Sequence, residues 1–161
     1  MAQPPTNPLS LFMPVIPGAD LAKIAAALAT AQGDLDAALN SVGTVHFARF
    51  LFLDTSKANL QPDLNPASTS QGPFIIGVVT EYDGDFDAYI QDFVNKVGPI
   101  FDLLLGFVVG GAALVPVANN VQDFTNFIAL NDASQHAPNQ GLYQAYPQTV
   151  QQIKAKFPPT S

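Results

Sequence analysis

The sequence predicts an α+β fold in which helices cover an antiparallel sheet. Two hydrophobic patterns support this prediction. Short apolar runs bounded by proline, glycine or aspartate predict strands at residues 9–16, 44–54 and 74–82. Longer segments with apolar residues three or four positions apart predict amphipathic helices after the first and the third of these strands. With a fourth strand expected near the C-terminus, the order matches the ferredoxin-like β-α-β-β-α-β unit with extra helices.

The two principal helices have recognisable starting points. Residues 19–41 predict the first helix, with Asp20 in the first turn, where the helix dipole favours a negative charge. Gly33 is a point at which this helix could divide. The second helix follows a turn at residues 83–85. Pro99 lies within its apolar stripe, and we expect a kink or a restart there.

The rest of the chain is less regular. Residues 1–8 are rich in proline and predict a flexible N-terminal arm, so that residues 9–161 form a single domain. Residues 55–73 predict a long mobile connection without periodicity. Residues 99–118 are apolar but contain an aspartate, two prolines and a glycine pair. We therefore expect a helix end and a buried loop there rather than a membrane span.

Three elements are expected in the C-terminal part of the chain. Asn120 is expected to cap a short helix. Residues 141–146 predict the fourth strand of the sheet, and residues 147–157 predict a terminal helix with one apolar face.

The composition excludes several classes of partner. The chain has 161 residues, a net charge of −7 and only six lysines and arginines. The basic residues form no cluster, which argues against binding to nucleic acid or to anionic membranes. The absence of cysteine excludes disulfides and thiolate metal sites. No secretory signal is recognisable, and we expect a cytoplasmic protein.

Residues 44–54 also predict how the protein assembles. Both alternating faces of this strand are apolar, and a strand of this kind is covered on both faces. The helices of a ferredoxin-like unit cover only one face of the sheet. An exposed apolar sheet face would promote aggregation, and 48% of the residues are hydrophobic. We therefore predict a homodimer that packs sheet against sheet.

Three segments of the sequence resemble a known family. They are residues 43–50 (GTVHFARF), residues 81–90 (EYDGDFDAYI) and residues 143–147 (YQAYP). In these segments the chain is similar to a group of uncharacterised bacterial proteins, some associated with peroxidase-like partners. Its predicted fold and dimer resemble the dimeric α+β barrel superfamily, which includes small monooxygenases, haem-degrading enzymes and peroxidases. The resemblance implies oxidative chemistry, with haem as a candidate cofactor.

His46 and Arg49 are the candidate catalytic residues. His46 could act as a general base or a haem ligand, and the alternative is a core histidine bonded to the backbone. Arg49 is the only arginine. It could clamp a substrate, and the alternative is a structural ion pair with Glu81, Asp83 or Asp85. Residues three apart on a regular strand point to opposite faces, so both serve one site only if a bulge intervenes.

Aromatic side chains supply the candidate ligand-binding residues. These are Phe50, Tyr82, Tyr89 and Tyr143. The tyrosines could line a pocket with their polar tips, and the alternative is ordinary aromatic packing in the core. The alternating aspartates that follow the third strand begin like a calcium loop, but the glycine and the glutamate that such a loop requires are absent. We therefore predict no metal site.

Two functions are compatible with these features. The first is a small-molecule-binding dimeric barrel that holds an apolar ligand or haem and carries out oxidative chemistry. The second is a non-catalytic dimer that scaffolds an enzyme partner. The surplus of aromatic residues favours the first function, and the scarcity of polar groups favours the second. A pocket beside His46 would distinguish the two.

Overall fold

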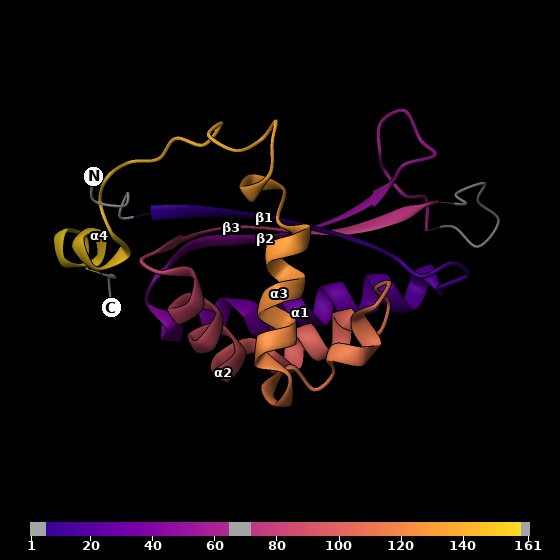
Figure 1. Ribbon diagram of the computed structural model, residues 1–161, viewed down its shortest axis with the longest axis horizontal. Coiled ribbons are helices and arrows are strands. Elements are labelled where there is room, and N and C mark those ends of the chain that lie inside the picture. Colours follow the sequence, from indigo (N-terminus) through magenta and orange to yellow (C-terminus); the bar gives the residue numbers. More distant parts are fainter. Residues whose placement is uncertain (1–5, 65–71, 159–161) are drawn as a thin grey trace.

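A three-stranded antiparallel sheet forms the centre of the protein (Figure 1). The computed structural model describes residues 6–64 and 72–158. β1 (Thr6–Pro14) and β2 (Val45–Asp54) both pair with β3 (Phe74–Asp83), so the strand order is β1-β3-β2. Together with the helices described below, this sheet confirms the predicted α+β class.

Two long helices lie against one face of this sheet (Figure 1). α1 (Leu21–Val42) begins after Asp20, whose carboxylate accepts hydrogen bonds from the first backbone N–H groups of the helix. It ends at Gly43, which has a φ of 72° that suits glycine. α2 (Phe86–Leu105) begins after Asp85, which caps the helix through the backbone N–H of Ala88. The turn predicted before this helix therefore supplies its N-cap.

Neither helix is interrupted where the sequence suggested a break. α1 continues through Gly33, because Ala31 and Leu35 on either side of it are fully buried and hold the two halves against the core. α2 also continues through Pro99. Pro99 is exposed, and Ile100 next to it is buried. The expected restart at Pro99 is therefore wrong. Tertiary packing outweighs the local cost of both residues.

The core lies between the sheet and the helices. On the helix-facing side, β1 contributes Leu9, Leu11 and Met13, all at most 3% exposed. A chain of aromatic rings then connects the sheet to the helices, with successive ring centroids between 4.1 and 5.5 Å apart. Its members are Tyr82 of β3, Tyr89, Phe93 and Phe101 of α2, and Phe124 of α3 (Val121–Asn131). Such contacts add to the free energy of burial.

The remaining helices are short. They are η1 (Gly111–Leu114), η2 (Val117–Asn119), α3 (Val121–Asn131), η3 (Ala133–Gln135) and α4 (Val150–Lys156). The apolar region at residues 99–118 is thus the end of α2 followed by short turns. In the parts of the chain that the structure describes, no helix has both the length and the hydrophobicity needed to cross a membrane.

The predicted fourth strand is wrong. Residues 141–146 have no regular secondary structure and pass over the face of the sheet that lies opposite the helices (Figure 1). The outer edge of β1 is instead bound by Asp132, which accepts a hydrogen bond from the backbone N–H of Ser10 at 2.9 Å. Ser134 donates to the carbonyl of Pro8 at 3.2 Å. These contacts occupy the edge that a fourth strand would use.

Two predicted irregular segments fall partly outside the described residues. Of the N-terminal arm predicted at residues 1–8, residues 1–5 lie outside them, and the remainder already belongs to β1. Of the connection predicted at residues 55–73, residues 65–71 lie outside them.

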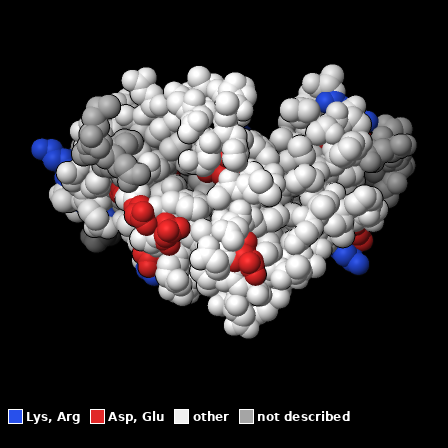
Figure 2. All heavy atoms as spheres, viewed as in Figure 1, with Lys and Arg blue, Asp and Glu red and all other residues white. Residues whose placement is uncertain are grey.

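One face of the sheet is covered by helices, whereas the other, here called the open face, is only partly covered. Pairing with β3 places alternate residues of each strand on the open face. Its apolar members are Phe12, Phe47, Leu51, Leu53, Ile75 and Val79. Phe47 is 45% exposed. Figure 2 shows a hollow on this side of the molecule, between the part formed by the C-terminal residues and the part formed by the connection after β2.

Replacing Phe101 by alanine tests the aromatic chain. Phe101 is 2% exposed and contacts a ring on each side, so Phe101→Ala is expected to lower the free energy of unfolding by about 3–5 kcal/mol. Leu103 of the same helix is 42% exposed, and Leu103→Ala should change the free energy of unfolding by only about 0.5 kcal/mol. Urea unfolding measures both. Equal losses in the two variants would contradict this description of the core.

Candidate functional site

A bulge at the start of β2 places His46 outside the regular alternation of the strand. Val45 pairs with Tyr82 of β3, but Phe47 pairs with Glu81, so that two steps along β2 match one step along β3. His46 is the extra residue. Val45 and Tyr82 face the helices, whereas Phe47 faces the open side. The bulge that the sequence left open as an alternative is therefore present.

The carboxylate of Asp83 holds the His46 side chain. Nε2 of His46 lies 2.9 Å from Oδ1 of Asp83, and the two side chains are only 14% and 11% exposed. The other carboxylate oxygen of Asp83 accepts a hydrogen bond from the backbone N–H of Val150 at 2.6 Å. Val150 is the first residue of α4. Asp83 therefore joins the end of β3, the start of β2 and the start of α4.

Further contacts fix α4 beside this pair. The side chain of Thr149 caps α4, and Gln152 bonds back to the Thr149 backbone, which forms a capping box. The side-chain amide of Gln151 donates to the carbonyl of Gly43 at 2.7 Å. α4 has only seven residues, and a helix of this length is not stable alone. These contacts therefore both stabilise α4 and hold it beside β2.

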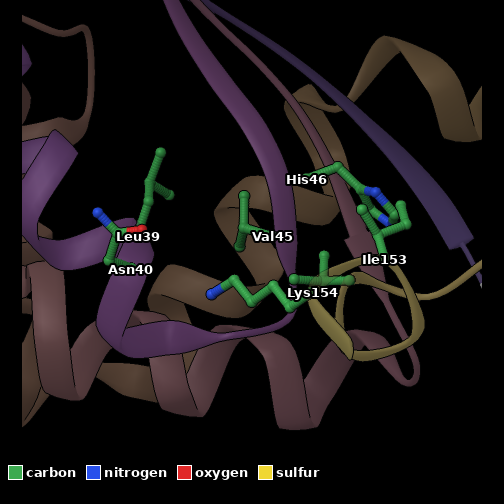
Figure 3. Close-up of a pocket in the computed structure, with 7 residues that line it drawn as sticks. Leu39, Asn40, Val45, His46, Ile153 and Lys154 are labelled. Atoms are coloured by element: carbon green, nitrogen blue, oxygen red, sulfur yellow. The ribbon is translucent and has the colours of Figure 1, made fainter. Parts of the chain in front are cut away.

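A cavity of about 400 Å³ lies between the end of α1, the start of β2 and α4. Its lining consists of Leu39 and Asn40 from α1, Val45 and His46 from β2, and Val150, Ile153 and Lys154 from α4. Figure 3 shows the imidazole of His46 next to Ile153, with Leu39 and Asn40 at the other end. A volume of this size falls in the range of about 300–1,000 Å³ that small-molecule sites occupy.

The hydrogen bond to Asp83 determines what His46 can do. An ionised carboxylate accepts hydrogen bonds but donates none, so the hydrogen in the contact belongs to Nε2 of His46. Nδ1 then carries the lone pair of the neutral ring. Among the described residues no group forms a hydrogen bond to Nδ1. An imidazole oriented in this way by a carboxylate is suited to accept a proton from a bound molecule.

Arg49 does not share this site. It lies on the open face, pairs with Val79 in the register of the sheet, and is exposed. It forms no ion pair with any residue that the structure describes, so the alternative of a structural ion pair within the chain is not observed. The bulge turns His46 toward Asp83, which is also on the open side, but the cavity contains His46 without Arg49.

The four candidate ligand-binding residues are not gathered at one site, although Tyr82 and Tyr89 lie together. Phe50 packs partly buried against the core on the helix side. Tyr82 stacks on Tyr89 with ring centroids 4.1 Å apart, and both are nearly fully buried. Tyr143 lies on the other side of the sheet, in a cavity of about 320 Å³ next to Phe12. No single pocket in the described parts of the chain contains all four.

Burial changes the ionisation of these tyrosines. Burial, together with the negative charges of Asp132 and Asp85, raises the pKa of Tyr82 to about 12. Burial also raises the pKa of Tyr89 above its usual value, although a hydrogen bond with Thr80 acts in the opposite direction.

Tyr143 joins the C-terminal residues to the open face. Burial and the neighbouring Glu81 raise the pKa of its phenol, and contact with Thr6 acts in the opposite direction. Its buried oxygen nevertheless meets neither Glu81 nor Thr6 in good hydrogen-bond geometry. Tyr143 therefore rests on the sheet by packing more than by a strong polar contact.

Three residues of this site are not recognisable as site residues from the sequence. The sequence suggests Asp83 as a partner for Arg49 and not for His46, because the bulge cannot be recognised from alternation. Asn40 and Lys154 lie far apart in the chain, in two different predicted helices. Nothing in their local sequence distinguishes them from other surface residues, and only the docking of α4 brings them together.

Alkaline unfolding tests the burial of Tyr82. In the unfolded chain a phenol ionises near pH 10, whereas folded Tyr82 keeps its proton up to about pH 12. Its contribution to the free energy of unfolding is therefore complete below pH 10 and is lost as the pH rises towards 12. Tyr82→Phe should show a shallower fall over this interval in urea unfolding. An unchanged slope would mean that Tyr82 ionises freely in the folded protein.

Comparison with known proteins finds no match for the chain. No family model matches the chain, and no curated protein or solved structure matches it. The contact between His46 and Asp83 at the wall of a cavity is therefore the observation from which a function can be inferred.

Proposed function

We propose that the protein binds a small molecule in the cavity beside His46, and that His46 accepts a proton from it. The 2.9 Å contact between Nε2 of His46 and Oδ1 of Asp83 supports this function most strongly. Binding sites commonly combine apolar walls with a few polar groups that fix the orientation of the ligand. Here Leu39, Val45 and Ile153 supply the apolar walls.

The proposed step is a simple proton transfer. A weakly acidic O–H or C–H group of the ligand gives its proton to Nδ1 of His46, and the bonding electron pair stays on the ligand. The positive charge that develops on the imidazole is stabilised by the carboxylate of Asp83. Asp83 keeps its second hydrogen bond to Val150 throughout, so the acceptor does not need to move.

The haem that the family resemblance implies does not fit this cavity. A histidine that donates to a carboxylate is a common metal ligand, so the pair of His46 and Asp83 alone would be suitable. The side chain of Lys154, however, extends across this cavity of about 400 Å³ and occupies space that a large rigid macrocycle would need (Figure 3). Oxidative chemistry at this site would need an oxidant brought by a second small molecule.

Blocking the cavity tests this proposal. Ile153 lines the cavity and is 39% exposed, so Ile153→Trp should fill it without disturbing the core. Fragments from a small-molecule library are expected to shift the methyl NMR signals of Leu39 and Val45 in the natural protein but not in this variant. Phe157→Trp is the control, because Phe157 lies outside the cavity and is 72% exposed. If no fragment shifts these methyl signals, the proposal is wrong.

A second candidate function is assembly, and the open face favours it. We propose that a second copy of the chain packs on this face, as in the dimeric α+β barrel that the sequence resembles. The face is apolar, with Phe47 45% exposed at its edge. It also carries one arginine, Arg49, and one glutamate, Glu81, which form no ion pair with described residues. Under a two-fold axis each Arg49 can face the Glu81 of the partner, so the surface is self-complementary.

Sedimentation measurements test this assembly. The natural protein is expected to be a dimer at micromolar concentration, because a monomer would leave the apolar open face in water. Phe47→Glu should give a monomer, since it introduces a charge into the contact. Leu130→Glu, at a residue 73% exposed on α3, should remain a dimer. A natural protein that is monomeric at this concentration would contradict the assembly.

A further inference from the structure

The cavity beside His46 differs in charge from the rest of the protein. The chain has thirteen acidic residues and six basic ones. Among the residues that the structure describes, the cavity lining nevertheless contains no aspartate or glutamate, and it includes Lys154. Asp83 is not in this lining, and its carboxylate is already hydrogen-bonded to His46. A negatively charged ligand would therefore meet a lysine and no carboxylate among the described lining residues.

The polar groups stand at different ends of this cavity. In Figure 3 the side chain of Lys154 extends from α4 toward Asn40, at the end of α1. His46 lies at the opposite end, beside Ile153. Between the two ends the lining includes Val45. A matching ligand has a charged group at one end and an apolar middle.

Lys154 is available for such a contact. It forms no ion pair with any residue in the described ranges, although Lys23 does so with Asp20. The charge of an exposed lysine is worth little alone, but a carboxylate with an apolar body gains from the walls of the cavity as well. An amine would instead approach the lysine with like charge, and an alcohol would gain no ion pair.

We infer that the cavity takes a small amphipathic carboxylic acid, with its carboxylate at Lys154 and its apolar body against Leu39 and Val45. This inference rests on the proposed function, because it names the ligand class of the same cavity. A carboxylate at Lys154 leaves the other end of the ligand beside His46.

Matched probes test the ligand class. Hexanoate, hexanol and hexylamine have the same apolar chain and differ in the polar group, and at pH 7 the acid is ionised. In NMR titrations of the full chain, hexanoate is expected to shift the methyl signals of Leu39 and Val45. It should bind about two to five times more tightly than hexanol, because it gains an ion pair with an exposed lysine. Hexylamine should bind most weakly.

Two lysine variants complete the test. Lys154→Gln should reduce the affinity for hexanoate to that for hexanol. Lys156→Gln, on the same helix but outside the cavity lining, should leave it unchanged. If hexanol or hexylamine binds in the cavity as tightly as hexanoate, the carboxylate class is wrong but ligand binding stands. If neither these probes nor any library fragment shifts the methyl signals, the proposed function fails as well.

Discussion

The carboxylate of Asp83 is the contact on which the candidate site depends. It ends β3, accepts hydrogen bonds from the His46 ring and from the first backbone N–H of α4, and is only 11% exposed. A buried carboxylate is costly unless hydrogen bonds satisfy it, and these two do so. Without this contact α4 would lose one of its two hydrogen-bonded attachments to the described residues of this region, and the hydrogen bond from Gln151 to Gly43 would remain. His46 would then lose its fixed orientation at the wall of the cavity.

The bulge at His46 links this site to the rest of the sheet. After the bulge, β2 alternates regularly, with Phe50 toward the helices and Arg49 on the open face. Before it, Val45 faces the helices and also lines the cavity. One extra residue thus separates two parts of the same strand for which we propose different roles. The end next to α4 lines the cavity, and the middle carries part of the apolar open face.

Much of the fold could be predicted from the sequence, and less of the site. The three strands and the two long helices follow from hydrophobic period and from local signals such as Asp20 near the start of α1 and the turn before α2. The sequence places Asp20 in the first turn, whereas the structure makes it the N-cap. The bulge at His46 depends on pairing with β3, which alternation along one strand cannot reveal. The missing fourth strand has a similar cause, because Asp132 and Ser134 bind the edge of β1 from a distant part of the chain. Asp83 and Lys154 come to the same site as His46 only through tertiary packing.

In the site that we propose, Asp83 holds the neutral ring of His46 with its hydrogen on Nε2, and Nδ1 is left to accept a proton. A long-range proton–nitrogen NMR correlation of the histidine rings measures this directly, with His46→Gln assigning the signal. We expect the neutral ring of His46 to show the Nε2–H form in the natural protein and to lose this preference in Asp83→Ala. A predominant Nδ1–H form in the natural protein would contradict the account, because a hydrogen-bond donor and not a base would then be available to the ligand.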